Sequence, residues 1–327
     1  MAKAKSEKKR ADQAPQGLTI FEQWVYDLMR IGLGEAQLQN PATWRAVSQQ
    51  LADAKASAMA RRLSEFGLRV AQDKDWADRA LEQFARQYLL ARSFPRLSQL
   101  PEGIQADIQG AVGFTVKQKE LLAQAGVHDI WLSVGRKAEV SSVDKLITQR
   151  TWLLGMRTGR AVLLLDFKHL MAPTELDRSL PPTTWIETEC VYFPSAYPQR
   201  ALAKARNPEP MMPNEHARAL KKLVVDGLPN AYPDSSAALN SYAAALALNP
   251  WLERFAMALS RVTPVADRTA LYFVDAQGDG LPTGPHFEEK WKLMALSGGA
   301  PITVFGEWDG TYFLPMSALA EGRFIAF

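Results

Sequence analysis

The hydrophobic pattern changes its period near residue 127, and this change limits the fold more than any other feature of the chain. Before it, apolar residues such as Leu18, Phe21, Val25 and Leu28 recur every third or fourth position, which is typical of helices. After it, residues 128–142 alternate and are rich in β-branched and aromatic side chains, which is typical of strands. We therefore expect an α+β protein, with an N-terminal all-helical domain followed by a mixed α+β domain.

About five helices are expected between residues 18 and 126. Asn40 and Pro41 form a start signal for the second, because Asn caps a helix and Pro fits its first position. From there the helical spacing continues without a visible stop from Trp44 to Phe66. The sequence therefore predicts one long second helix.

The second half mixes hairpins with helices. Gly159 lies in the predicted turn of one hairpin, and Asp309-Gly310, the strongest turn signal of the chain, lies in another. The predicted strands cover residues 146–156, 161–167, 185–193, 269–275, 302–308 and 311–315. The predicted helices cover residues 214–225, 235–248, 250–262 and 288–296.

The length of 327 residues suits two domains. We expect a disordered basic tail at residues 1–16, a helical domain at 17–126 and an α+β domain at 127–327. The Pro-rich stretch at 207–213 suggests an internal break in the last of these.

The net charge of +3 comes wholly from residues 1–16, which carry two acidic residues against five basic ones. The basic residues are Lys3, Lys5, Lys8, Lys9 and Arg10. They are read either as a solvated leader or as an arm that binds nucleic acid or an acidic partner. The rest of the chain is neutral and gives no sign of a nucleic-acid surface.

The chain has one cysteine, Cys190, which fits a reducing compartment such as the cytoplasm. No signal peptide is expected, and no apolar run reaches the length of a membrane span, so no membrane partner is expected either.

No motif for catalysis, a metal or a cofactor is found. The four histidines lie too far from one another and from Cys190 to suggest ligand spacing. The glycines from Gly278 to Gly284 lack dinucleotide-loop spacing and read as a surface turn. We therefore predict no catalytic residue, no metal ligand and no cofactor, and a protein that is not an enzyme.

Arginine and tryptophan gather on the first hairpin, at what are expected to be its exposed ends. The residues are Arg150, Trp152, Arg157 and Arg160. This combination is frequent at protein interfaces, although it is also common on ordinary sheet faces. We name the four as a candidate protein interface.

Several stretches resemble bacterial SWIM zinc finger domain-containing proteins, in the region that follows the finger. The resemblance covers roughly residues 18–205 and depends on the order and spacing of the stretches more than on any single motif. The stretches are Phe21–Leu33, Thr43-Trp44, Leu51–Ala56, Ala60–Leu63, Gln149–Trp152, Leu163–Phe167 and Val191–Pro198.

The zinc ligands of that family follow a Cys-x-Cys and Cys-x-His pattern, and this chain has only Cys190 and separated histidines. No zinc residue can therefore be transferred. The resemblance implies a role in binding protein or nucleic acid, and partners of two kinds, an AAA+ ATPase and a von Willebrand factor A protein. The chain is either a finger-less relative or a fragment of a longer protein.

Three hypotheses on function remain. The leading one is a non-enzymatic interaction or scaffold protein, working with an AAA+ ATPase system. The alternative is a nucleic-acid-associated protein that uses the basic tail. The third is an enzyme with an unrecognised site in the α+β half, where distant acids and a histidine could converge.

Overall fold

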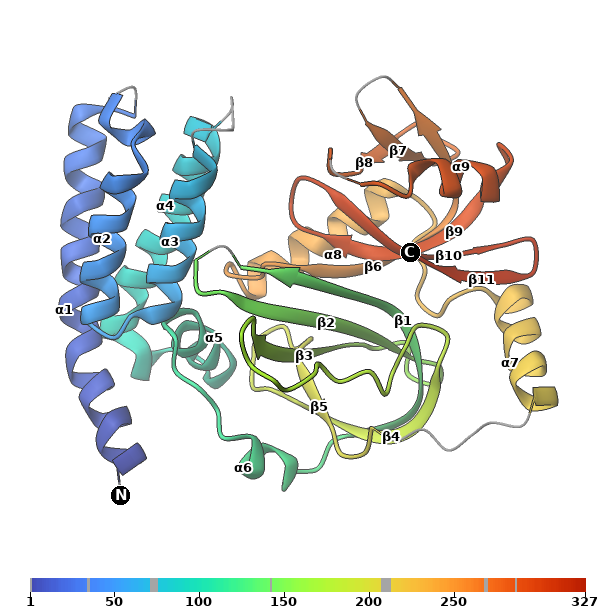
Figure 1. The fold of residues 1–327 in the computed structure, drawn as a ribbon, viewed down its shortest axis with the longest axis horizontal. Helices are drawn as coiled ribbons and strands as arrows, with labels where there is room; N and C mark the ends of the chain where they lie inside the picture. Colours follow the sequence, from blue (N-terminus) through green and yellow to red (C-terminus); the bar gives the residue numbers. More distant parts are fainter. Residues whose placement is uncertain are drawn as a thin grey trace.

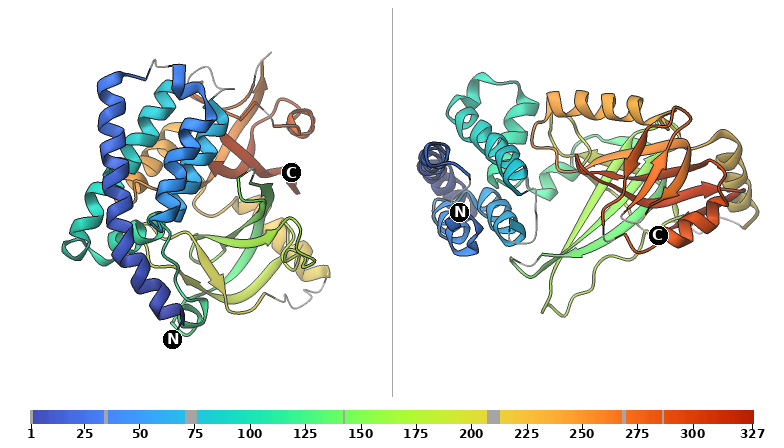
Figure 2. Two further views of the ribbon diagram at one scale, coloured as in Figure 1. Left: turned by 60° about the vertical axis from the view of Figure 1, so that its left-hand side comes forward. Right: turned by 90° about the horizontal axis from the view of Figure 1, so that it is seen from above.

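A computed structural model describes residues 2–33, 36–70, 76–141, 143–206, 213–267, 270–285 and 287–327. A helical bundle comes first in the chain and two antiparallel sheets follow, which confirms the predicted α+β class (Figure 1). The bundle stands beside the sheets, with the first helix on the side away from them (Figure 2).

The bundle is built from helices α1 to α5, and a short helix α6 leads into the sheets. Their bounds are α1 Ala2–Ile31, α2 Pro41–Asp53, α3 Ser57–Val70, α4 Trp76–Ser93, α5 Glu102–Val112 and α6 Gln118–Leu122, with 3₁₀ turns at Ala36–Gln39 and Phe94–Gln99. Asn40 caps α2 as predicted, because its side-chain oxygen accepts the backbone N–H of Ala42 at 3.0 Å.

Helix α1 begins at Ala2, where the sequence analysis expects a disordered tail. The physical reason is that Ala, Lys, Glu, Gln and Arg, which dominate this stretch, are strong helix formers. Pro15 lies inside the helix and lacks the N–H for one helical hydrogen bond. Its own carbonyl oxygen accepts the Thr19 hydroxyl at 3.0 Å.

The single long helix predicted from Trp44 to Phe66 is wrong. The structure divides it into α2 and α3 at Lys55, which has a left-handed backbone with φ of 64°. Both helices keep their apolar residues on the inner face, so the spacing of the apolar residues hides the break.

Trp44 lies at the centre of the bundle core. Its side chain is fully buried, and its indole N–H donates to the carbonyl oxygen of Leu38 at 2.7 Å. Its ring stacks on Phe84 at 5.7 Å and meets Phe66 edge-on at 5.1 Å. A Cβ added at Gly67 would lie 2.4 Å from the Cβ of Trp44. The close approach of α3 to this side chain therefore requires glycine at position 67.

The first sheet has the strand order β3-β2-β1-β4-β5. Its strands are β1 Val127–Val140, β2 Leu146–Gly155, β3 Ala161–His169, β4 Trp185–Tyr192 and β5 Ala201–Ala203. The sheet curls until its edges meet, where the Leu163 N–H donates to the Gln199 carbonyl oxygen at 2.8 Å. It thereby encloses its own core, which includes Trp131, Leu164 and Cys190.

The second sheet has the strand order β11-β10-β9-β6-β7-β8. Its strands are β6 Phe255–Ala266, β7 Leu271–Val274, β8 Gly280–Pro282, β9 Ile302–Trp308, β10 Phe313–Ala320 and β11 Arg323–Ala326. Two helices, α8 Ser235–Leu248 and α9 Lys290–Ser297, pack on the face of this sheet away from the first. A third, α7 Pro213–Asp226, contributes Leu223 to the core between the sheets.

The helix predicted at residues 250–262 is wrong, because strand β6 begins at Phe255. Phe255 and Leu259 have the spacing of one helix face, but with Met257 they also alternate as a strand does. All three are buried against the helices that cover the second sheet. Pairing of β6 with β9 therefore decides between the two patterns.

A buried carboxylate joins the two sheets. Glu307 of β9 has 1% of its side chain exposed and accepts the Nε–H of Arg150 of β2 at 2.8 Å. The indole N–H of Trp152 donates to the same carboxylate at 2.6 Å. The remaining Arg150 nitrogens make a bidentate pair with Glu139 of β1 at 2.8 Å each.

The bundle is attached to the sheets by the segment before β6. The Trp251 ring packs against the bundle core, and its N–H donates to the Arg86 carbonyl oxygen of α4 at 3.0 Å. Arg62 of α3 pairs with Glu253 at 2.6 Å. On another side, Asp107 of α5 accepts the backbone N–H of Ala196 at 2.8 Å.

In the part of the chain that the structure describes, no helix is both long and apolar enough to cross a bilayer.

Replacing the carboxylate between the sheets should destabilise the protein strongly. In Glu307→Gln the buried Arg150 keeps its charge and loses one of its two carboxylate partners, so we expect a loss of about 3 kcal/mol of unfolding free energy. Urea denaturation measures it.

The matched control is Glu187→Gln. Glu187 also pairs with an arginine, Arg157, but both side chains are more than half exposed, and the expected loss is below about 1 kcal/mol. Equal stability losses in the two variants would contradict a special role for the buried pair.

Candidate functional site

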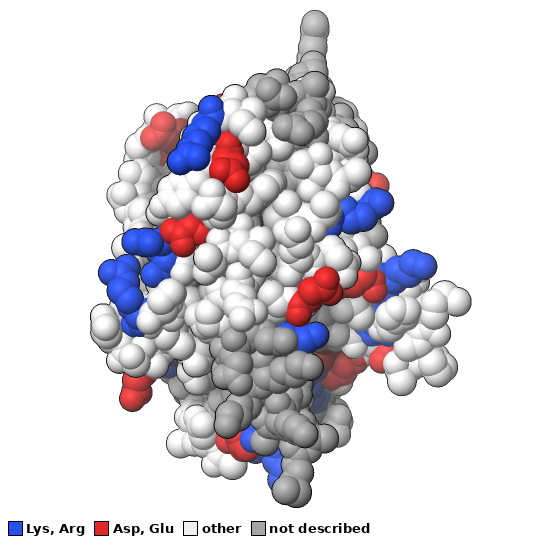
Figure 3. Space-filling model, turned by 90° about the vertical axis from the view of Figure 1, so that its left-hand side faces the viewer, with Lys and Arg blue, Asp and Glu red and all other residues white. Residues whose placement is uncertain are grey.

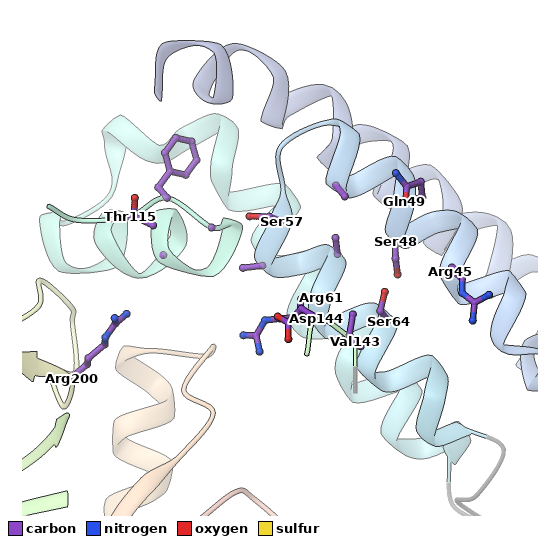
Figure 4. Close-up of a pocket in the computed structure, with 16 residues that line it drawn as sticks. Arg45, Ser48, Gln49, Ser57, Arg61, Ser64, Thr115, Val143, Asp144 and Arg200 are labelled. Carbon is purple, nitrogen blue, oxygen red and sulfur yellow. The ribbon is translucent and has the colours of Figure 1, made fainter. Parts of the chain in front are cut away.

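An open groove of about 580 Å³ lies between the bundle and the first sheet (Figure 4). Helices α2 and α3 form one wall, and the chain just after α5 lines one end. The turn between β1 and β2 and the residue before β5 complete it. The site is therefore made by segments that are far apart in the sequence.

The helical wall is rich in arginine and serine. Arg45 and Ser48 come from α2, and Ser57, Arg61 and Ser64 come from α3. Figure 4 shows Ser48 and Ser64 pointing toward one another between the two helices. The Ser48 hydroxyl donates to the Trp44 carbonyl oxygen at 2.7 Å, so this part of the wall is tied to the bundle core.

The turn between β1 and β2 reaches the helical wall and is held there. Ser141 donates its hydroxyl to Glu65 of α3 at 3.3 Å. Glu65 also pairs with Arg61 at 3.3 Å. Asp144 of the same turn accepts the backbone N–H of Leu146 at 3.2 Å, which stabilises the turn itself.

Arg200 enters the groove from the side of the first sheet, and its side chain points toward the helices in Figure 4. Its guanidinium lies over the Phe193 ring at 4.3 Å and within 6.0 Å of the Phe167 ring. Part of the side chain reaches solvent, yet removal of water by the surrounding protein lowers its pKa. Arginine remains charged at neutral pH in spite of this shift.

Positive charge predominates in the groove. Its lining includes the guanidinium groups of Arg45, Arg61 and Arg200 and one carboxylate, Asp144. Among the described residues, neither Arg45 nor Arg200 forms an ion pair within 4.0 Å. Serine and threonine hydroxyls add hydrogen-bond donors, so the arrangement suits an anionic ligand.

The sequence analysis did not identify this groove. Arg45 and Arg61 lie on the polar sides of helices whose apolar faces were predicted correctly, and such arginines are usually solvated surface residues. Arg200 is 139 positions from Arg61, and no local pattern signals that the two approach the same groove.

The basic tail residues lie outside the described side chains. The structure gives a helical backbone for Lys3, Lys5, Lys8, Lys9 and Arg10 as part of α1. Their proposed contact with nucleic acid or an acidic partner stays a prediction.

The candidate interface on the first hairpin is divided by the structure. Arg150 and Trp152 are 7% and 0% exposed, so the expectation that they lie at an exposed end is wrong. The reason is that residues two apart in a strand share a face, and here this face is covered by the second sheet. Their partner Glu307 is too distant in sequence to be foreseen.

Arg157 and Arg160 are exposed on the turn between β2 and β3, which confirms the hairpin prediction. Arg157 pairs with Glu187 at 3.1 Å, and the guanidinium of Arg160 lies over the Tyr192 ring at 4.3 Å. Their role in an interface stays a prediction.

Asp129 of β1 stabilises the turn between β2 and β3 through hydrogen bonds. Its carboxylate accepts the backbone N–H groups of Arg157 at 3.0 Å and Thr158 at 2.9 Å, and the Thr158 hydroxyl at 2.6 Å. Burial alone would raise the pKa of Asp129, but these hydrogen bonds and one from the Ile130 N–H lower it on balance.

A second cavity, of about 310 Å³, lies near this turn and is lined by Tyr197, Tyr232 and Phe305. Among the described residues that line the two cavities, Asp144 is the one carboxylate, and there is no histidine. The convergence of acids and a histidine that the enzyme hypothesis requires is not seen in either.

Within the described residues, no group of three or more His, Cys, Asp or Glu side chains is placed to hold a metal ion. Asp166 and Asp177, which are far apart in sequence, do approach each other, but both bind Arg206, at 2.7 and 2.9 Å.

Residues 9–112 match the family model of the SWIM-associated four-helix bundle domain. The match begins within α1 and ends at the last residue of α5, so it covers the helical wall of the groove and not the sheets. Neither the curated proteins nor the solved structures gave a match. The resemblance of the helical part to a SWIM-associated region is thereby confirmed.

The lone cysteine should be unreactive in the folded protein. Cys190 is fully buried in the core of the first sheet, and burial raises the pKa of its thiol to about 12. With a disulfide reagent at pH 8 we expect slow reaction of the native protein and fast reaction after unfolding in guanidinium. Fast reaction of the native protein would contradict the described core.

Asp129→Asn should destabilise the protein by about 2 kcal/mol near neutral pH, because a carboxylate accepts these hydrogen bonds better than an amide. The folded pKa is lowered, so the stabilisation exists above the unfolded value of about 3.9 and disappears as the pH falls through the folded pKa.

Unfolding free energies should therefore differ by a constant amount between pH 5 and 8 and converge below about pH 4. Asp226→Asn, at an exposed position on α7, is the control and should show no such difference. A difference that stays constant down to pH 2 would contradict the role of the carboxylate charge.

Proposed function

We propose that this chain is a non-enzymatic interaction or scaffold protein that works with a SWIM-associated ATPase system. The observation that supports this proposal most is the match of residues 9–112 to the SWIM-associated four-helix bundle domain. The resemblance of residues 18–205 to the post-finger region of SWIM zinc finger proteins agrees with it.

The architecture is suited to such a role. The bundle is joined to the sheets by Trp251, by the Arg62–Glu253 pair and by Asp107, so two structurally different parts present one continuous surface. The groove lies at their junction and offers charged groups to a partner. A partner that contacts both parts would be held in a defined orientation.

The partner that we propose is an AAA+ ATPase, together with a von Willebrand factor A protein. This choice depends on the resemblance to SWIM zinc finger proteins. The proposed location is the cytoplasm, which agrees with the single cysteine of the chain.

Affinity purification of the chain from its own cells, read by mass spectrometry, tests the proposal. We expect an ATPase of the AAA+ class to be recovered in a fixed ratio to the chain. Removal of residues 1–16 should leave this recovery unchanged, because residues 17–112 of the matched region and the whole groove lining remain. Recovery of the chain alone, or of nucleic acid in place of protein, would contradict the proposal.

A second candidate function is nucleic-acid association through the N-terminal part of α1. Five basic residues against two acidic ones in residues 1–16 favour it. Binding of a DNA duplex would then decrease steeply with salt and disappear when residues 1–16 are removed. Binding that persists without these residues and does not respond to salt would exclude this function.

A further inference from the structure

We infer that the groove between the bundle and the first sheet binds an acidic, extended peptide segment of a partner protein. The inference rests on the proposed function, because it identifies the kind of partner segment that an interaction protein of this structure would hold. It is argued from the charge, the shape and the lining of the groove.

The charge of the groove favours a negative ligand. Arg61 already has Glu65 as a partner at 3.3 Å, whereas Arg45 and Arg200 form no ion pair with any described residue. Both side chains are exposed, and the Arg200 guanidinium lies over the Phe193 ring, so their N–H groups remain accessible to a ligand. A ligand carboxylate supplies the missing partner and forms hydrogen bonds that are stronger than those between neutral groups.

The position of the arginines favours an extended ligand over a single small ion. Arg45 and Arg200 lie at opposite ends of the groove in Figure 4, with Arg61 between them. They belong to α2, to the segment before β5 and to α3, respectively. An extended chain that carries several carboxylates can reach separate guanidinium groups, as a single carboxylate cannot.

The walls between the arginines leave room for a peptide backbone. They include the small residues Ala52, Ala58, Ala60, Gly110 and Gly113. A Cβ added at Gly110 would meet no atom within 4 Å, so this position faces open space in the groove. The hydroxyls of Ser57, Ser64 and Thr115 can both donate to and accept from peptide groups.

The charge distribution argues for an acidic peptide over nucleic acid. Outside residues 1–16 the positive and negative charges of the chain are equal in number. On the outer side of the bundle, charges of both signs are scattered among large uncharged areas (Figure 3). Nucleic acid needs a broad basic surface for its row of phosphates, whereas a short acidic peptide needs only a few placed arginines.

The experiment is a selection of short random peptides on the full chain, followed by calorimetry. We expect the recovered peptides to be enriched in Asp and Glu. A synthetic peptide of the enriched sequence should bind, and its Asn/Gln counterpart should not. Arg45→Ala and Arg200→Ala should each weaken binding about tenfold, the effect of losing one charge-assisted hydrogen bond.

Two further variants separate groove binding from nonspecific charge effects. Gly110→Leu places a side chain in the groove without changing any charge. Leucine favours a helix more than glycine does, so α5 should still form and the variant should fold. We expect it to lose peptide binding. Arg30→Ala removes an exposed arginine of α1 that does not line the groove and should bind as the unmodified chain does.

Absence of acidic enrichment, or equal binding by the Asn/Gln peptide, would overturn the inference. Unchanged peptide binding in Arg45→Ala, Arg200→Ala and Gly110→Leu would also overturn it. So would binding of a single-stranded oligonucleotide by the unmodified chain that is lost in these variants, because the groove would then be a nucleic-acid site. If the cellular ATPase is still recovered by all three, the proposed function stands and the groove is not its site. If acidic peptides bind but cells contain no partner, the groove assignment stands and the proposed function fails.

Discussion

The attachment of the helical bundle to the sheets determines whether the candidate groove exists, and Trp251 provides the largest side chain in it. Trp251 belongs to the segment before β6, but its indole ring packs against the core of the helical bundle. The indole N–H donates a hydrogen bond to the Arg86 carbonyl oxygen. The Arg86 guanidinium in turn donates a hydrogen bond to the Leu252 carbonyl oxygen at 3.5 Å. Because the groove walls come from both parts, their separation depends on this attachment. Trp251 acts together with the Arg62–Glu253 pair, the Asp107–Ala196 hydrogen bond and the Ser141–Glu65 hydrogen bond.

The sheets supply the rigid side of that attachment. Glu307 accepts hydrogen bonds from Arg150 and Trp152, so β9 of the second sheet cannot move independently of β2 in the first. Removal of water from both charges is costly, so the net stability that such a buried pair adds is small, although removal of one partner alone is strongly destabilising. The bundle is held on α5 as well, where a Cβ at Gly103 would lie 2.9 Å from the Ala196 backbone. Arg62, which lies in the part of the chain that matches the SWIM-associated bundle model, and Ala196 are among the residues that join the two parts.

Local patterns were enough to predict much of the fold and little of the candidate site. The Asn40 cap, the hairpin turns at Gly159 and Gly310, and the change of period near residue 127 are short-range signals, and the structure agrees with them. The break at Lys55 was missed because the apolar spacing continues across it, and other errors occur where distant partners decide the structure. Residues 250–262 have spacing that fits a helix, but pairing with β9 makes part of them β6. Arg150 and Trp152 have an interface-like composition, but Glu307 buries them. The groove has no short-range signal, because it exists only once the bundle has docked.

The measurement that tests this account most directly is differential scanning calorimetry of the full chain. If the bundle and the sheets form one unit, unfolding should occur in a single transition, with equal calorimetric and van't Hoff enthalpies. In Trp251→Ala the same scan should separate into two transitions as the attachment is lost. Two well-separated transitions in the unmodified chain would contradict the account, because the bundle would then unfold independently and the groove would have no fixed walls.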